Sequence, residues 1–226
     1  MQNQFFRTEL LFHEEGMQRL YNSKVAVFGV GGVGGYTVEA LARSGIGQID
    51  IYDHDAFDIT NLNRQLHALH STLGENKVDV VKLRILDINP NVIVNAFKLF
   101  YMPDSSDKVD LKGYNYIVDA IDTITGKVEL IVNATQNRVP IVSSMGAGNK
   151  IEASSFKVTD IYSTSICPMA KIMRHELRRR GIKKLKVVFS TEIPKQRDVP
   201  PSSTAFVPSV VGLILAGEVV KDIVYG

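Results

Sequence analysis

The chain has 226 residues, 45% of them hydrophobic and 22% charged, with a formal net charge of +2; these values exclude a disordered, collagen-like or coiled-coil chain. It is long enough to bury a sizeable core, and we expect one domain. The N-terminal segment lacks a signal-peptide pattern, and the longest apolar run, residues 205–217, is too short to span a bilayer, so we expect a cytoplasmic protein with no membrane partner.

Strand-like and helix-like segments alternate along the first two thirds of the chain. Strands are expected over 24–29, 49–52, 91–100, 114–122 and 139–145, and helices over 34–44, 77–87 and 127–137. This order predicts an α/β fold of Rossmann-like type, with a mostly parallel sheet and helices on both faces. The pattern changes from residue 156 onward, where a mixed C-terminal extension should follow, with a basic helix, a strand over 186–191, a proline-rich loop over 193–208 and a last helix from about Ser209.

A glycine-rich loop follows the first expected strand. Gly29, Gly31 and Gly34 fit the pattern G-x-G-x-x-G between a strand and a helix, and Gly32 belongs to the same loop. Glycine lets the backbone approach an anionic group, and the helix N-terminus offers free N–H donors. Asp53 ends the second strand, where it can accept hydrogen bonds from a ribose. The motif predicts a nucleotide, but NAD and ATP fit it equally, and glycines that merely pack a turn would look the same.

The segment after the second strand favours a nucleoside triphosphate. Asn61 and Arg64 are three residues apart, hence on one face if the segment is helical, and Lys77 begins the next helix. Two cations suit the charge of a leaving pyrophosphate better than that of NAD. At the end of a later strand, Asp119 and Asp122 lie where open α/β sheets form their ligand crevice, and Asp122 is a candidate Mg²⁺ ligand. Alternatively, both carboxylates only cap the following loop.

Taken together, the motifs GVGGVGG, DHDAFDITNLNRQ, GENKVD, INP and VDAIDT resemble the E1-like adenylating family, the ThiF, MoeB and HesA group that activates carboxylates with ATP. The resemblance covers residues 7–145 and implies a single adenylation domain over 1–226, with a nucleotide-binding core over 1–148 and an extension over 149–226. It implies that ATP and Mg²⁺ are held by the glycine loop together with Asp53, Asp55, Asn61, Arg64, Gln65, Lys77, Asp119 and Asp122.

The same resemblance implies catalytic roles for Arg64, Lys77 and Asp122. It also implies a homodimer in which Arg7 reaches the neighbouring subunit's ATP; taken alone, Arg7 is a solvated terminal charge. Many family members hold a structural zinc with two C-x-x-C pairs. This chain has one cysteine, Cys167, so we expect neither zinc nor an internal disulfide.

The segment CPMAKIMRHELRRRGI followed by VVFSTEIP resembles the branch of this family that dehydrates threonylcarbamoyladenosine in tRNA, which implies a tRNA substrate. Composition supports a nucleic-acid partner independently. Residues 171–186 hold eight cations and one acid, a net +7, so the rest of the chain carries −5. Such a patch suits RNA phosphates, although a solvated helix face would look the same. The candidate tRNA contacts are Lys171, Arg174, Arg178 and Arg179.

Cys167 precedes Pro168 at the expected start of the basic helix, near cations, a setting that favours a nucleophilic thiolate. It would then suit an activator of a ubiquitin-like or sulfur-carrier protein, with a sulfur-relay protein as partner; an inert small side chain is the alternative. Two further hypotheses stay open. An NAD-dependent oxidoreductase would need a second domain, and a non-catalytic RNA-binding module would have no use for Arg64, Lys77 and Asp122 together.

Overall fold

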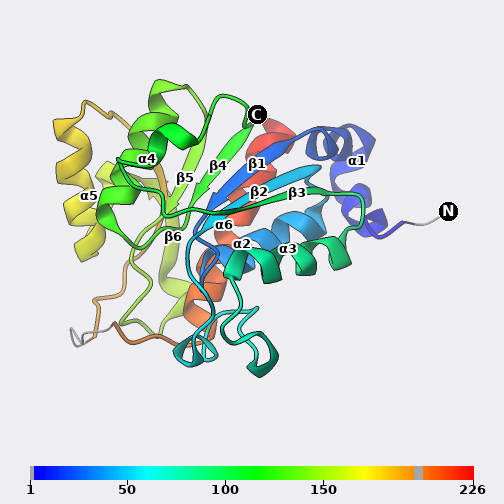
Figure 1. The fold of residues 1–226 in the computed structure, drawn as a ribbon. Helices are drawn as coiled ribbons and strands as arrows, with labels where there is room; N and C mark the ends of the chain where they lie inside the picture. Colours follow the sequence, from blue (N-terminus) through cyan, green and yellow to red (C-terminus); the bar gives the residue numbers. More distant parts are fainter. Residues whose placement is uncertain (1–2, 196–200) are drawn as a thin grey trace.

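The computed structural model describes residues 3–195 and 201–226, and these form a three-layer α/β fold around one twisted sheet (Figure 1). Proline-rich loop residues 196–200, including Pro200, lie outside the described residues. Seven strands are seen in the described part, in the order β3-β2-β1-β4-β5-β7-β6. Their bounds are β1 Lys24–Phe28, β2 Gln48–Asp53, β3 Ile93–Lys98, β4 Tyr116–Asp119, β5 Ile141–Ser144, β6 Phe156–Asp160 and β7 Lys186–Ser190.

Each pair of neighbouring strands from β3 to β7 is parallel, and the edge strand β6 pairs antiparallel with β7. The predicted mostly parallel sheet with a mixed C-terminal part is therefore confirmed. Parallel strands need crossover helices, and the alternation of segments along the chain already indicated them.

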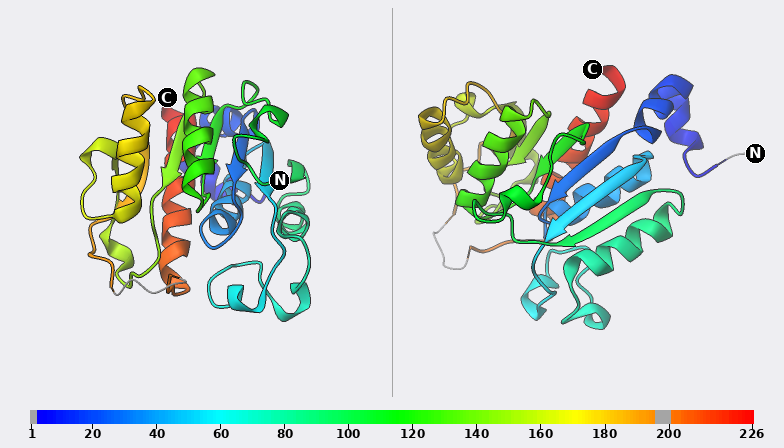
Figure 2. Two further views of the ribbon diagram at one scale, coloured as in Figure 1. Left: turned by 60° about the vertical axis from the view of Figure 1, so that its left-hand side comes forward. Right: turned by 45° about the horizontal axis from the view of Figure 1, so that its top comes forward.

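The helices are α1 Phe6–Tyr21, α2 Gly34–Ser44, α3 Lys77–Ile88, α4 Ile124–Gln136, α5 Pro168–Arg179 and α6 Phe206–Tyr225. Helices α2, α3 and α6 cover one face of the sheet, and α4 and α5 cover the other (Figure 2). The alternation of side chains along a strand explains the two cores. In β1, for example, Val25 and Val27 face α2 and α6, whereas Ala26 and Phe28 face α4.

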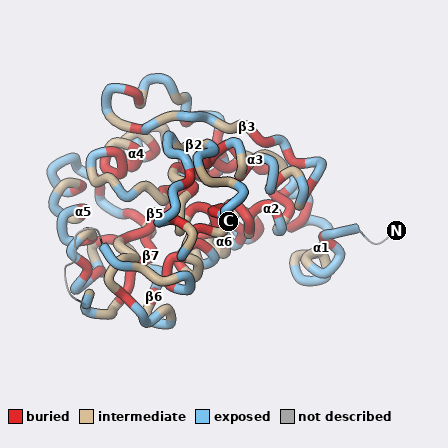
Figure 3. The backbone as a smooth tube through the Cα atoms, turned by 60° about the horizontal axis from the view of Figure 1, so that its bottom comes forward, coloured by how far each residue is buried: buried red, intermediate tan, exposed pale blue. Residues whose placement is uncertain are grey.

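Figure 3 shows that the central strands are buried along most of their length, as a sheet covered on both faces must be. Three local expectations need correction. Helix α4 begins at Ile124, one turn before the expected start, and α6 begins at Phe206 rather than near Ser209. Helix α1 was not expected, and a non-helical residue inside it, His13 with φ 59°, interrupts the periodicity that would have indicated it.

The chain crosses from one face of the sheet to the other between β1 and β4. Helix α2 leaves β1 on one face and α4 leaves β4 on the opposite face, so the loops after these two strands diverge. Such a switch point opens a crevice at the carboxyl ends of the strands. The glycine loop and the segment carrying Asp122 both border it.

Candidate active site

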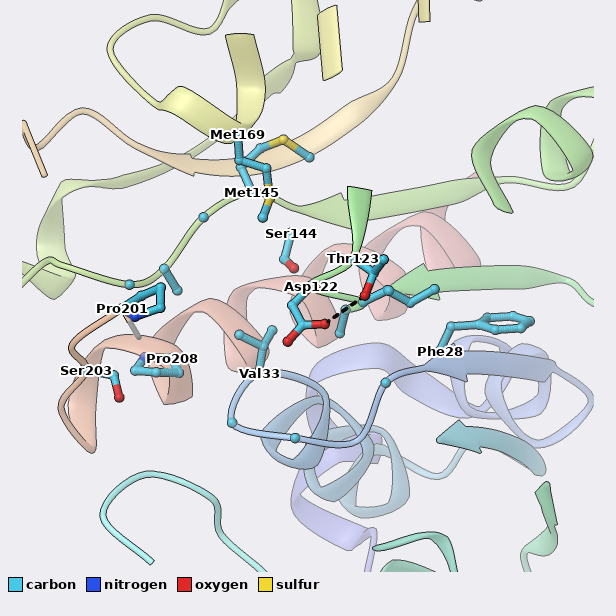
Figure 4. A pocket seen from close by; sticks show the side chains of 18 of the residues that line it. Phe28, Val33, Asp122, Thr123, Ser144, Met145, Met169, Pro201, Ser203 and Pro208 are labelled. Carbon is cyan, nitrogen blue, oxygen red and sulfur yellow. Dashed lines mark hydrogen bonds between the residues drawn. The ribbon is translucent and has the colours of Figure 1, made fainter. Parts of the chain in front are cut away.

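A cavity of about 980 Å³ occupies this crevice (Figure 4). One wall is formed by the glycine loop, the end of β2 and residues Arg64, Gln65 and Lys77; we call it the nucleotide wall. The facing wall is formed by residues 144–150 and 167–169, and we call it the acceptor wall; parts of 201–208 complete the lining, with Pro208 beside Gly32 of the glycine loop. Asp122 lies between them in Figure 4, with Val33 on one side and Ser144 on the other.

The glycine loop turns sharply under steric constraints that glycine alone meets. Gly29 has φ +84°, and a Cβ there would lie 2.7 Å from the carbonyl oxygen of Ala120. A Cβ on Gly34 would lie 1.7 Å from the carbonyl oxygen of Gly29. Gly29, Gly31 and Gly32 line the cavity, whereas Gly34 packs the turn beneath it. The loop therefore opens onto the cavity, beside the N-terminus of α2.

Asp53 and Asp55 extend the nucleotide wall at the end of β2. The Asp53 carboxylate accepts hydrogen bonds from the backbone N–H of Val30 at 2.8 Å and of Asp55 at 2.9 Å. The first bond ties the end of β2 to the glycine loop. Lys77, buried at the start of α3, forms an ion pair with Asp55 at 2.7 Å.

Arg64 and Gln65 enter the cavity from the loop between β2 and α3. The Arg64 guanidinium donates to the backbone oxygen of Thr60 at 2.8 Å and to Asn63 Oδ1 at 2.9 Å, which orients it. Buried Gln65 lies near Gly31, and its Oε1 has no hydrogen-bond partner among the residues that the structure describes. A buried amide oxygen without a partner at a cavity wall is the condition expected where a hydrogen-bond donor of a ligand binds.

Asn61 does not line the cavity with Arg64. Its Oδ1 accepts a hydrogen bond from the backbone N–H of Asp58 at 3.1 Å, within a capping box around the 3₁₀ turn Ile59–Asn61. The segment forms a 3₁₀ turn, Ile59–Asn61, followed by a loop rather than an α-helix.

Asp122 is exposed in the cavity, and its Oδ1 accepts a 3.4 Å hydrogen bond from the Thr123 hydroxyl (Figure 4). Asp119 lies outside the cavity lining, fully buried, with Oδ2 2.9 Å from Lys127 Nζ and 2.6 Å from the Ser143 hydroxyl oxygen. The sequence pattern could not separate these two carboxylates, because the partner that draws Asp119 inward comes from α4. Asp122 thus remains free to act as a ligand.

The acceptor wall contains a buried cysteine and a buried lysine. Cys167 is the N-cap residue of α5 and Pro168 is at the first helical position, as predicted, but the thiol is only 1% exposed. Lys150 is also buried, and its ammonium donates to the carbonyl oxygen of Gly146. Burial lowers the pKa of Lys150 from its usual value. Neither composition nor spacing distinguished Lys150 in the sequence.

Arg7 and the basic side chains of α5 lie outside the cavity lining. In α5, Ala170, Met173 and Leu177 are buried as expected, while Lys171, Arg178 and Arg179 are exposed. Arg174 instead turns toward the preceding loop, where it donates to the Thr164 carbonyl oxygen at 3.0 Å. Arg7 is an exposed residue of α1, which lies at the opposite end of the sheet from α5 in Figure 1.

Together, the switch-point crevice, the glycine loop and the acidic end of β2 define a Rossmann-like nucleotide-binding protein. The ThiF family model matches residues 6–225, and the chain belongs to this family. The E1-like resemblance of the motifs is thereby confirmed. Among the described residues, no helix has the length and hydropathy required to cross a bilayer.

Two similar proteins are tRNA threonylcarbamoyladenosine dehydratases of bacteria. That of Bacillus subtilis is 47% identical over 242 residues, which cover 99% of this chain and 95% of the relative. That of Escherichia coli is 37% identical over 196 residues, covering 83% of this chain and 73% of the relative. The crystal structure of the Escherichia coli enzyme, TcdA, in complex with ATP matches with a TM-score of 0.92 at 33% identity, over 97% of this chain and 93% of that one.

Proposed function

We propose that the protein adenylates the carboxylate of threonylcarbamoyladenosine in tRNA with ATP and then closes the ring with net loss of water. The observation that carries this proposal is a 980 Å³ cavity with a nucleotide wall facing an acceptor wall, in a fold shared with an ATP-bound dehydratase. The whole chain is proposed to act as one adenylation domain, because β6 and β7 of the extension complete the sheet begun by the core.

ATP is proposed to bind along the nucleotide wall. Asp53 accepts hydrogen bonds from the ribose hydroxyls, and the backbone of the glycine loop and the amide N–H of Gln65 donate hydrogen bonds to the phosphates. Arg64 and Lys77 contribute the positive charge that the departing pyrophosphate requires. Asp122 fits a Mg²⁺ ligand, because its carboxylate is exposed beside the loop and has only a long hydrogen bond to Thr123. A bound magnesium ion would neutralise phosphate charge there.

In the first step, a carboxylate oxygen attacks the α-phosphorus, the bond to pyrophosphate breaks and an acyl adenylate forms. In the second, the carbamoyl group of the same substrate attacks the activated carbonyl carbon, a proton is lost and AMP leaves. Because nucleophile and electrophile belong to one molecule, proximity replaces a second enzyme-bound nucleophile. The acceptor wall's task is to exclude water and hold the substrate in a cyclising conformation.

The decisive experiment measures the AMP formed from ATP under three conditions: with tRNA carrying threonylcarbamoyladenosine, with the same tRNA unmodified, and without tRNA. We expect AMP and the cyclised, dehydrated nucleoside with modified tRNA alone. Equal AMP formation in all three, or a ring-closed product without AMP, would contradict the proposal.

A second candidate function is activation of a ubiquitin-like or sulfur-carrier protein, with a sulfur-relay protein as partner. The chain is 31% identical to the adenylyltransferase and sulfurtransferase uba4 of Ogataea parapolymorpha over 170 residues, 73% of this chain and 43% of that protein. The position of Cys167 in the cavity lining favours this candidate. Cys167→Ser distinguishes the two functions: intramolecular cyclisation should keep most of its rate, whereas transfer through a thioester should be abolished.

A further inference from the structure

Lys150 is a buried cation with unused hydrogen-bonding capacity. It is 3% exposed and lies over the Phe156 ring, its Nζ 5.9 Å from the ring centroid. Of its three N–H donors, one is accounted for by the Gly146 carbonyl oxygen. Among residues 3–195 and 201–226, no carboxylate lies within ion-pair distance of it.

Two titratable groups, Glu192 and Cys167, act electrostatically on Lys150, and neither forms an ion pair with it among the described residues. Glu192 acts on it electrostatically, but that carboxylate accepts hydrogen bonds from the backbone N–H groups of Ile151 at 3.2 Å and Glu152 at 2.9 Å. The Cys167 thiol, if ionised, would also raise the pKa of Lys150. A buried ammonium without a full ionic partner is costly, and a ligand anion would remove that cost.

The position of Lys150 on the acceptor wall indicates which ligand anion it would bind. A Cβ on Gly146, whose carbonyl oxygen Lys150 binds, would lie 3.8 Å from Cys167 Sγ and 3.7 Å from Met169 Cβ, so the ammonium belongs to the acceptor wall. Arg64 and Lys77 are on the nucleotide wall. Among the described lining residues, Lys150 is thus the lysine or arginine of the acceptor wall, whereas Arg64 and Lys77 belong to the nucleotide wall.

We propose that Lys150 binds the carboxylate of the tRNA nucleoside and presents it to the α-phosphate. This inference rests on the proposed function. The carboxylate and the phosphate are both anions and repel one another, so a cation on the acceptor side is needed to bring them together. The carboxylate loses its charge on adenylation. Lys150 therefore binds the substrate more strongly than the acyl adenylate and does not hold back ring closure.

The test uses Lys150→Met, which keeps the length of the side chain and removes its charge. Free threonylcarbamoyladenosine nucleoside and its carboxamide are compared as inhibitors of AMP formation on modified tRNA. The native protein should prefer the carboxylate about tenfold, and Lys150→Met should bind both alike. The variant's KM for modified tRNA should rise about tenfold, while ATP affinity measured by calorimetry stays unchanged.

Exposed Lys112 precedes β4 and lies outside the cavity lining, so Lys112→Met is the matched control and should behave as the native protein. Lys150→Gln, which retains a donor for Gly146, serves if Lys150→Met fails to fold, as judged by thermal unfolding. Persistent discrimination between the two nucleosides in the folded variant would overturn the inference. So would a parallel loss of ATP affinity, which would assign Lys150 to the phosphates. Absence of AMP formation by the native protein on modified tRNA would instead refute the proposed function and the inference with it.

Discussion

Asp119 and Lys127 hold the backbone that presents Asp122. The Asp119 carboxylate accepts from the Ile121 N–H at 3.1 Å, and the Lys127 ammonium donates to the Ile121 carbonyl oxygen at 3.0 Å. The backbone N–H and carbonyl oxygen of Ile121 are thereby both hydrogen-bonded to a fully buried ion pair. Asp119 thus lies outside the cavity lining and supports the site through the backbone next to Asp122.

Removing one member of this pair should therefore be costly. Lys127→Met leaves the Asp119 carboxylate buried without its cation, and we expect the free energy of unfolding to fall by about 3–5 kcal/mol in urea denaturation. The double variant Lys127→Met/Asp119→Asn should recover part of this loss because the buried charge is gone. A single variant as stable as the native protein would show that water or another group compensates the carboxylate.

Arg64 is expected to contribute to catalysis rather than to the stability of the fold. Its guanidinium is partly exposed and is held by Thr60 and Asn63. Arg64→Ala should lower the rate of AMP formation about 10²- to 10³-fold, since it removes a charge that acts on the separating pyrophosphate. Thermal unfolding should change little. Near-native turnover in Arg64→Ala would place the phosphate-stabilising charge elsewhere.

His67 makes stability depend on pH. It is 5% exposed, packs against Gly35 beneath the glycine loop, and burial lowers its pKa to about 4. The ordinary pKa is about 6.5 in the unfolded chain, so the unfolded state binds more protons between these values. His67 should therefore cost no stability above pH 6.5 and progressively destabilise the fold as pH falls toward 4, by up to about 3 kcal/mol.

Urea denaturation between pH 7 and pH 4 measures this effect directly. His67→Gln should reduce the loss of stability over that interval, although the variant's stability at pH 7 will be lower if the amide packs less well. An unchanged pH dependence in His67→Gln would assign the titration to other groups.

At the scale of the element, α5 divides its cations between structural and free roles. Arg174 secures the preceding loop at Thr164, and the Arg178 guanidinium lies 5.0 Å from the centroid of the Tyr162 ring. Arg179 lies 3.8 Å from Glu176, in a pair exposed enough to contribute little. The apolar stripe that holds the helix to the sheet follows directly from sequence periodicity. The assignment of each arginine does not, since it depends on which loop lies beside the helix.

Reversal of Arg178 and Arg179 to glutamate should weaken tRNA binding and reduce its salt dependence. Each lost phosphate contact should lower the slope of log affinity against log salt by about 0.7 to 0.9. ATP affinity should be unaffected because neither residue lines the cavity. Arg174→Ala, by contrast, should lower the melting temperature. Unaltered tRNA binding by the reversed helix would favour the solvated-face alternative.

At the scale of the whole molecule, we propose a homodimer with composite sites. Arg7 is an exposed residue of α1 and does not line its own chain's cavity, so it could contact ATP only in another chain. On the same helix, Leu10 is 64% and Leu11 is 67% exposed, and exposed apolar side chains of this size are suited to an interface. Sedimentation should give twice the monomer mass.

Complementation tests the composite site. Arg7→Ala and Asp122→Asn should each be inactive alone. After subunit exchange, half of the dimers are mixed and have one site with both residues intact, so roughly a quarter of native activity should return. No recovery despite proven exchange would mean that Arg7 acts within its own chain or not at all.

The sequence was sufficient to predict the alternation of strands and helices, the glycine loop, the acidic end of β2 and the apolar stripe of α5. These are local signals: hydrophobic periodicity, conformational demands on glycine, and residue spacing within one βα unit. Contacts between distant segments were needed to show that Asp119 turns inward to Lys127 while Asp122 stays exposed, and that Lys150 lies buried on the acceptor wall. The reason is physical. Burial and ion pairing depend on which distant segments meet, and residues as alike as two aspartates in one short segment acquire different roles only when α4 and the sheet close around one of them.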